Sequence, residues 1–506
     1  MLSKAQKEIV EQSGNLIVRA SAGTGKTHTM VSKIEYDIKS QRSHKVVAAI
    51  TFTIKAAKEI RERLNIDPSQ HFIGTNNSFA IEEIIKPFIR DVFGQEYKRD
   101  MNTDYSVKVN TFAEGLSKIS SEQTLCSYQN NKENFIFQLA LEILKKSKAC
   151  QLYLQAKYFK IYIDEYQDCD KDMHNLFMYI CDMLKIDTFV VGDEKQSIYI
   201  WRGAYPKAIM SIWERTDFSK KLLRDNFRSC QQIQNYSNLL CNETRSLYVS
   251  TEDLTPVVVI CSHANNWVKS VVQHLDPHQR CALLRYSNAN AEQGANDLSL
   301  GSMHFTYVPP TPITDITTEV AWLYNAIAKY FILPKYSAYD LRDEIPNEVV
   351  GNKKIINFIK KALSSLDEFI MQNDANNFIK HVALIAEHLG YKAKEDHCSK
   401  LYETICDERY HSAFKMDDLK RVAITFHSSK GLEFEQVILF TSDYRLSNDQ
   451  EIYNHYVAAT RAKNKLILVH NIDDWRAKKY AENINNILAA SSLKMSSVAT
   501  VINNTQ

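Results

Sequence analysis

Residues 15–34 read NLIVRASAGTGKTHTMVSKI, and this stretch decides the fold class of the first part of the chain. The apolar run NLIVR is typical of a short buried strand. Small residues follow it, and Met30, Ile34 and Ile38 then recur at helical spacing. We therefore expect a strand, a loop and a helix in that order.

The same alternation of strands and helices continues along the chain. Further strand-like runs lie at 46–52, 160–163, 188–191, 256–260, 282–285, 422–426, 437–440 and 466–469. Strands that alternate with helical segments are typical of a parallel sheet. The sequence therefore predicts an α/β fold with two parallel-sheet lobes.

Two long helical and polar stretches interrupt these lobes, and a Ser/Asn-rich tail follows them. We expect a first lobe at 1–79 and 151–215 with a helical insertion at 80–150, a second lobe at 216–289 and 412–490 with a helical insertion at 290–411, and a flexible tail at 491–506.

The composition sets limits on the partners and the compartment. Hydrophobic residues make up 44% of the 506 residues, so a sizeable core is expected. The formal charge is only +2, so any DNA site must be a local groove. We expect no membrane association, because no run approaches the roughly 18 apolar residues that a span needs. The ten cysteines show no CxxC or zinc-like spacing, which favours reduced thiols in a cytoplasm.

The loop after the first strand has the residues of a phosphate-binding site. The backbone N–H groups of such a loop, together with the start of the following helix, favour phosphate oxygens. Lys26 would then reach the β- and γ-phosphates, and Thr27 would bind Mg²⁺. Ala20 stands where the general pattern has glycine, and a chance turn ending in Lys-Thr is the alternative. The other loop residues of the candidate site are Ala22, Gly23, Thr24 and Gly25.

Two carboxylates follow the strand-like run at 160–163. We expect Asp164 to bind the metal ion and Glu165 to act as the base that activates water. The alternative is a solvated strand end, which the upstream phosphate-binding loop disfavours.

Aromatic and basic residues after the run at 188–191 are candidates for contacts with bases and phosphates. Tyr199, Trp201 and Arg202 could form a stacking surface for bases, although buried core aromatics are the alternative. Arg228 and Arg461 could be arginine fingers that face a bound nucleotide, although surface arginines are the alternative.

Together these segments resemble the ordered motifs of the superfamily 1 DNA helicases of the UvrD/Rep/PcrA type. The matching segments are ASAGTGKT at 20–27, TFTIKAAKEI at 51–60, DEYQD at 164–168, GDEKQSIYIWRGA at 192–204, NFRS at 226–229, HSSKGLEF at 427–434 and YVAATRAK at 456–463.

The resemblance implies further roles for single residues. It implies that Gln6 reads adenine, that Phe227 stacks on adenine, and that Glu433 lies near the ribose. His28 stands where many relatives have an arginine beside the base. The remaining implied site residues are Gln196 in catalysis, Arg228 at the γ-phosphate, Arg461 as the second arginine finger, and Phe52 and His427 on the DNA path.

Some positions depart from the family pattern. Ile54 stands where asparagine is usual, and Asn76 and Asn77 replace the usual Phe-His pair. Both segments normally touch single-stranded DNA. The second insertion is also shorter than in the housekeeping helicases, which weakens the expectation of processive unwinding.

Within that superfamily the chain is most similar to the helicase-like subunit of the Gabija anti-phage defence system. The stretches KYFKIYIDEYQD at 157–168, DKDMHNLFMY at 170–179 and QSIYIWRGA at 196–204 carry this resemblance. It implies a partner of the OLD-like type, a nuclease subunit with an ABC-type ATPase core and a TOPRIM domain, in a hetero-oligomer.

The predicted function is a two-lobed RecA-like motor that uses ATP and Mg²⁺ and acts on single-stranded or end-bearing DNA, with 3′-to-5′ polarity implied by the resemblance. One alternative is a DNA-end-sensing ATPase subunit that activates a partner nuclease with little unwinding. A non-motor P-loop enzyme, such as a small-molecule kinase, is disfavoured because it needs no second lobe with paired arginines.

Overall fold

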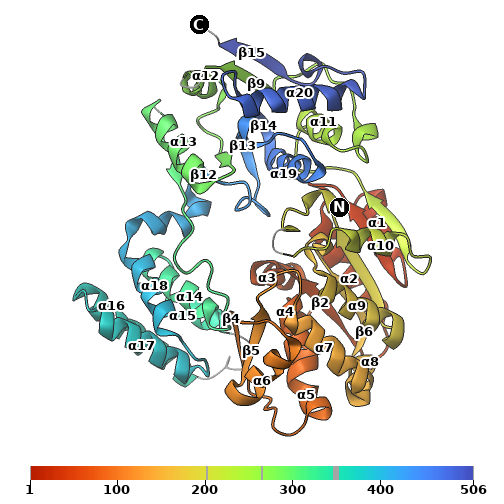
Figure 1. The fold of residues 1–506 in the computed structure, drawn as a ribbon, viewed down its shortest axis with the longest axis vertical. Helices are drawn as coiled ribbons and strands as arrows, with labels where there is room; N and C mark the ends of the chain where they lie inside the picture. The colour runs from red at the N-terminus through yellow and green to blue at the C-terminus, as the bar shows by residue number, and fades with distance from the viewer. Residues whose placement is uncertain (1, 201–202, 264–265, 302, 346–352, 505–506) are drawn as a thin grey trace. The chain divides into compact units, whose positions relative to one another are not determined.

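The computed structural model describes residues 2–200, 203–263, 266–301, 303–345 and 353–504. The chain folds into two compact units, of which unit 1 comprises Met1–Met101, Lys108–Leu275 and Phe426–Gln506. Unit 2 comprises Asn102–Val107 and Asp276–Thr425. Figure 1 traces the chain through both units. Within the described ranges, no helix is long and apolar enough to cross a membrane.

Unit 1 contains a six-stranded parallel sheet with the strand order β3-β2-β6-β7-β1-β8. Its strands are β1 (Leu16–Ala20), β2 (Val46–Thr51), β3 (Phe72–Thr75), β6 (Tyr158–Ile163), β7 (Asp187–Gly192) and β8 (Ser219–Leu223). The helices of this part are α1 (Lys4–Glu11), α2 (Lys26–Ser40), α3 (Ile54–Arg63), α4 (Asn76–Phe79), α5 (Lys86–Phe93), α6 (Phe112–Glu122), α7 (Phe135–Lys146), α8 (Lys148–Lys157), α9 (Lys171–Leu184) and α10 (Lys207–Trp213).

Local sequence explains where several of these elements begin. Thr53 caps α3 by accepting a hydrogen bond from the N–H of Ala56, and Asp170 caps α9 through the N–H of Met173. Strand β1 is an apolar run with buried residues on both faces, as expected for the interior of a parallel sheet. The sheet therefore holds the loop after β1 on a rigid base.

A second group of parallel strands in unit 1 pairs in the order β13-β14-β9-β15. These strands are β9 (Val257–Ser262), β13 (Phe434–Phe440), β14 (Ala462–Asn471) and β15 (Thr500–Asn504), and the helices around them are α11 (Gln231–Leu240), α12 (Trp267–His274), α19 (Asp449–Ala459) and α20 (Trp475–Ala489). The strands of these two groups in unit 1 therefore pair in parallel, as predicted.

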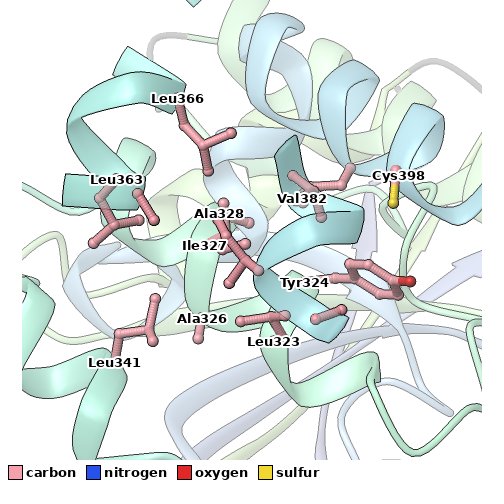
Figure 2. Packing of buried hydrophobic residues seen from close by; sticks show 14 of the residues in the cluster. Leu323, Tyr324, Ala326, Ile327, Ala328, Leu341, Leu363, Leu366, Val382 and Cys398 are labelled. Atoms are coloured by element: carbon pink, nitrogen blue, oxygen red, sulfur yellow. The ribbon is translucent and has the colours of Figure 1, made fainter. Parts of the chain in front are cut away.

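Unit 2 combines three parallel strands, in the order β11-β12-β10, with a bundle of helices. Its elements are β10 (Cys281–Arg285), α13 (Asn288–Leu300), β11 (Thr306–Tyr307), α14 (Ala321–Ile332), α15 (Ala338–Asp343), α16 (Lys353–Met371), α17 (Ala375–His388), α18 (Glu395–Cys406) and β12 (Arg421–Thr425). Figure 2 shows apolar side chains of this bundle converging from several helices, among them Leu323, Leu366 and Val382. This cluster is the core of unit 2.

The structure confirms the predicted α/β fold with parallel sheets and corrects several details. The stretch 80–150 was expected to be helical, but it also contains β4 (Asn102–Val109) and β5 (Thr124–Tyr128). The stretch 290–411 likewise contains the short strand β11. Polar residues alternate with apolar ones in β4, so its sequence does not show the apolar run by which the other strands are recognised.

Two further expectations, one on strand β8 and one on the C-terminal tail, differ from the structure. Strand β8 was expected in the second lobe but pairs with β1 in the first sheet. The tail at 491–506 was expected to be flexible, yet residues 500–504 form β15, which pairs with β9. Backbone hydrogen bonds to β9 hold this uncharged segment, and its own side chains gave no sign of them. The assignment of the chain to four domains remains a prediction.

Candidate active site

The loop between β1 and α2 has the backbone that a phosphate-binding loop needs. Gly23 and Gly25 both have a φ near +75°, a region that favours glycine. A Cβ atom at Gly23 would also lie 2.4 Å from Oδ1 of Asn226, so no larger residue fits there. Ala20 is the last residue of β1 and has no positive φ, so its methyl group replaces the usual glycine hydrogen without backbone strain.

Thr27 and Asp164 form the candidate metal site. The Thr27 hydroxyl donates a hydrogen bond to Oδ2 of Asp164 at 3.2 Å, and the N–H of Glu165 donates to Oδ1 of Asp164 at 2.8 Å. One hydroxyl and one carboxylate are oxygen donors of the kind that suits Mg²⁺. Burial and the adjacent Glu165 raise the pKa of Asp164 by more than Lys26 and the two hydrogen bonds lower it.

Glu165 lies beside the lysine of the loop. Its Oε1 atom is 3.4 Å from Nζ of Lys26, and its Oε2 atom accepts a hydrogen bond from the amide of Gln167. Although burial raises the pKa of Glu165, Lys26 and Lys430 lower it by more, so the carboxylate stays ionised. The backbone of Glu165, two residues after the end of β6, has a φ of +51°, which is uncommon outside glycine.

A chain of buried hydrogen bonds runs from Glu165 to Arg461. Gln167, whose amide binds Glu165, accepts a hydrogen bond from the N–H of Asp193 at 3.0 Å. The Asp193 carboxylate accepts from the amide of Gln196 at 2.8 Å, and Oε1 of Gln196 accepts from the Arg461 guanidinium at 3.3 Å. Each amide both donates and accepts, so this chain fixes the orientation of every member.

Arg461 is buried, with 1% of its surface exposed. Its guanidinium donates to the carbonyls of Val457 and Leu432 at 2.9 and 3.3 Å. Burial, together with the nearby positive charge of Arg228, lowers the pKa of Arg461 to about 9. This site favours an anion, because a bound negative charge would offset the free-energy cost of burying the charged guanidinium.

Arg228 lies in the same part of the site and is held by two contacts. Its Nε atom donates to Glu433 at 2.8 Å, and its guanidinium also donates to the carbonyl of Thr460 at 3.0 Å. Glu433, expected near the ribose, forms a second ion pair with Lys463 at 2.7 Å. Glu433 is thus held between two cations in this structure.

The residues expected around the adenine differ in exposure. Gln6 is buried, donates to the Thr24 carbonyl at 3.2 Å, and accepts from the N–H of Ser3 at 2.9 Å. The amide of Gln6 is therefore fixed against the loop. Phe227 is 63% exposed, which suits a stacking surface, and its N–H donates to the Gly23 carbonyl at 2.8 Å. His28 is exposed at the start of α2.

Two of the predicted DNA contacts lie together. The rings of Tyr199 and His427 are 6.5 Å apart, and Nζ of Lys430 lies 4.7 Å from the centroid of the Tyr199 ring. Phe52 is half-buried at the end of β2. Trp201 and Arg202 lie outside the described residues.

The sequence interpretation missed Lys430, which contacts residues of both the candidate ATP site and the candidate DNA site. Its ammonium forms an ion pair with Asp168 and donates to the carbonyl of Gln196 at 3.1 Å. Its position inside the quoted segment HSSKGLEF was the only signal, because Asp168 is 262 residues away in the sequence. Tyr456 and Asp193 were also missed, and each is buried between segments distant in the sequence.

The chemistry of this arrangement follows from its charges. Lys26 can neutralise phosphate oxygens, while an ionised Glu165 can accept a proton from water. Two arginines from the C-terminal half of unit 1 supply further positive charge. Within the ranges that the structure describes, no cluster of three His, Cys, Asp or Glu side chains could form a separate metal centre.

Two segments of the chain match known protein families. Residues 4–202 match an AAA domain, and residues 420–469 match the UvrD-like helicase C-terminal domain. The chain is 28% identical to the ATP-dependent DNA helicase Rep of Buchnera aphidicola over 293 residues, which are 47% of this chain and 45% of that protein. It is 26% identical to the ATP-dependent DNA helicase PcrA of Staphylococcus epidermidis over 47% of this chain and 39% of that protein.

The fold, the site and these matches define the chain as a UvrD-like helicase. It is also 40% identical to the Gabija protein GajB of Bacillus cereus over 498 residues, which cover 97% of this chain and 99% of that protein. The chain therefore belongs to the GajB family of Gabija proteins.

Proposed function

We propose that this chain is an ATP-driven DNA motor that acts in the cytoplasm with a partner nuclease in anti-phage defence. The observation that carries the proposal is the buried hydrogen-bond chain from Glu165 to Arg461, because it joins a candidate base to a candidate arginine finger. A purely structural P-loop domain has no need for such a link.

In the proposed reaction, each side chain has a separate task. Lys26 binds the β- and γ-phosphate oxygens, and Glu165 accepts the proton of the attacking water. Arg228 and Arg461 stabilise the negative charge that develops on the transferred phosphoryl group. A Mg²⁺ ion held by Thr27 and Asp164 would supply further positive charge at the phosphates.

Coupling to DNA rests on the contacts of Lys430. Its ammonium lies over the Tyr199 ring and also binds Asp168 and the Gln196 carbonyl. A base stacked on Tyr199 would therefore lie close to the Lys430 ammonium, which also contacts residues of the proposed ATP site. This arrangement favours an ATPase whose turnover responds to DNA.

The motor proposal is tested with purified protein on tailed duplexes. ATP hydrolysis should rise on addition of single-stranded DNA, and a strand should be displaced from a duplex with a 3′ tail but not from one with a 5′ tail. Tyr199→Ala should weaken single-strand binding about 5- to 150-fold, since base stacking contributes about 1 to 3 kcal/mol per base. Tyr36→Ala, which removes an exposed tyrosine of α2, is the control. ATPase activity that DNA does not change would contradict the proposal.

A DNA-end-sensing ATPase is the second candidate, and the segment after β3 favours it. Asn76 lies where the helicase family has an aromatic residue, and its amide contacts Sδ of Met173 at 3.3 Å. An amide that faces the protein offers no stacking surface for a base. Hydrolysis stimulated by blunt duplex ends, with no strand displaced from either tailed duplex, would select this candidate.

The partner proposal follows from membership of the GajB family. We propose an OLD-like nuclease subunit with a TOPRIM domain and an ABC-type ATPase core as the partner in a hetero-oligomer. Co-expression with the nuclease encoded beside this chain should give one high-mass species in light scattering. Separate elution of the two proteins at micromolar concentration and low salt would contradict the partner, while leaving the motor proposal intact.

A further inference from the structure

Tyr456 connects the phosphate-binding loop to the last sequence motif. It lies on α19 with 1% of its surface exposed, and its hydroxyl oxygen accepts a hydrogen bond from the N–H of Ala22 at 3.1 Å. Ala22 is part of the loop that carries Lys26. The two partners are 434 positions apart in the sequence.

The ring of Tyr456 has a second polar contact. Nζ of Lys195 lies 5.6 Å from the ring centroid, and the same ammonium forms an ion pair with Asp193 at 2.7 Å. Asp193 belongs to the hydrogen-bond chain between Glu165 and Arg461. The hydroxyl of Tyr456 thus contacts the loop while its ring contacts the side of that chain.

Other residues of the same helix attach to the segment after β7. The amide of Gln450 donates to the Ser197 carbonyl at 3.4 Å, and Arg461, just beyond the end of α19, donates to Gln196. These contacts fix α19 against residues 193–197. The hydrogen bond of Tyr456 adds a direct link from α19 to the phosphate-binding loop.

We propose that Tyr456 is a positioning residue for ATP hydrolysis, whose hydroxyl sets the distance between the phosphate-binding loop and Arg461. This inference rests on the proposed ATPase function and adds a residue to it. Arg461 lies just beyond the end of α19. Its Nε atom donates a hydrogen bond to the carbonyl of Val457, the residue that follows Tyr456. A shift of Tyr456 therefore moves the backbone that holds the guanidinium.

The effect should appear in turnover rather than in nucleotide binding. Arg461 stabilises charge that develops only in the transition state, so a misplaced guanidinium lowers kcat. The loop itself keeps Lys26 and its N–H groups, so KM for ATP should change little. A tyrosine that serves only as core packing would instead change the stability and leave kcat per folded molecule unaltered.

Tyr456→Phe is the informative variant because it keeps the ring and removes only the hydroxyl. We expect kcat for ATP to fall about three- to tenfold, as for loss of one neutral hydrogen bond, with KM within about twofold of the wild type. In an Arg461→Ala background, measured under single-turnover conditions, the same change should cost less than about twofold. The group that Tyr456 positions is absent there.

Tyr480→Phe is the matched control. Tyr480 is also buried, and its hydroxyl lies near Tyr236 and His455, on the α20 side of α19. This variant should leave kcat and KM unchanged per folded molecule.

Three outcomes would overturn the role of Tyr456. They are an unchanged kcat in Tyr456→Phe, a raised KM with normal kcat, and full additivity with Arg461→Ala. If the wild-type chain hydrolyses no ATP under any condition, the proposed function fails and not this inference alone.

Discussion

The polar cluster of unit 1 and the helical core of unit 2 bury opposite kinds of side chain. In unit 1, Asp193, Lys195 and Arg461 are each almost fully buried, and each has a charged or hydrogen-bonding partner. In unit 2, the cluster around Leu323 and Leu366 consists of apolar side chains. Buried ion pairs contribute little net stability, whereas buried apolar area contributes much. The apolar cluster can therefore supply stability to the fold, whereas the proposed function gives the polar cluster a chemical role.

The largest expected effect is a loss of ATP turnover with the fold kept. Lys26→Ala and Glu165→Gln should each lower ATP turnover about 1,000-fold, because one removes phosphate charge stabilisation and the other removes the base. The free energy of unfolding should change by less than about 1 kcal/mol, since neither side chain is part of an apolar core. Steady-state ATPase assays and urea unfolding measure the two quantities.

Lys58→Ala is the control for this pair, because Lys58 is an exposed lysine of α3. It should leave both quantities unchanged. If either site variant retained more than about a tenth of wild-type turnover, the role assigned to that residue would be wrong.

The next effect is a loss of stability in unit 2 with ATP turnover kept. Leu366→Ala should destabilise unit 2 by about 2 to 5 kcal/mol, because it removes a fully buried side chain and leaves a cavity. Hydrogen exchange of the amides in α14 and α17 reports this loss locally. Basal ATP turnover per folded molecule should stay the same.

Met371→Ala on the same helix is the matched control for Leu366→Ala. Met371 is 82% exposed, so its truncation should cost less than about 0.5 kcal/mol. Equal effects of the two variants on exchange in α14 and α17 would show that the cluster in Figure 2 is not the core of unit 2.

The smallest effect concerns a neutral histidine beside the polar cluster. His455 is buried against Tyr236, Tyr444 and Tyr480, and burial lowers its pKa from 6.5 to about 3. Below pH 6.5 the unfolded chain therefore binds a proton that the folded chain does not. The corresponding stability is complete above pH 6.5 and is lost as the pH falls toward 3.

Between pH 7 and pH 5.5 this one group should cost about 1 kcal/mol of unfolding free energy. His455→Gln should remove that part of the pH dependence, as measured by urea unfolding at the two pH values. An identical pH dependence in wild type and His455→Gln would contradict the assignment.

The sequence allowed the parallel strands to be predicted because they are apolar runs. Strands β1, β2, β6, β7 and β14 were located in this way, each within a few residues. Strands β4 and β15 were missed because neither is an apolar run: their sequences, NTDYSVKV and TVINN, are mostly polar. Strand β15 also depends on its pairing with β9, about 240 positions earlier, which local periodicity does not reveal.

The candidate site was predictable in its residue types but not in its connections. The ordered motifs identified Lys26, Glu165 and Arg461, which the structure brings into one unit. They did not predict that Gln167 and Asp193 would link these residues, or that Glu433 would pair with Arg228 and Lys463. Such links depend on side-chain orientation, which only the packed structure determines.

The pairing of β15 with β9 has a consequence for synthesis of the chain. Val258 pairs with Thr500, so the edge of β9 lacks its neighbour until about 240 further residues have been made. At roughly 5 to 20 residues per second, that interval is about 12 to 50 s. During this time the nascent chain exposes an uncovered strand edge, a feature that promotes aggregation. Ribosome-associated chaperones are therefore expected to matter more for this half of the protein than for the first sheet, whose strands are all made by residue 223.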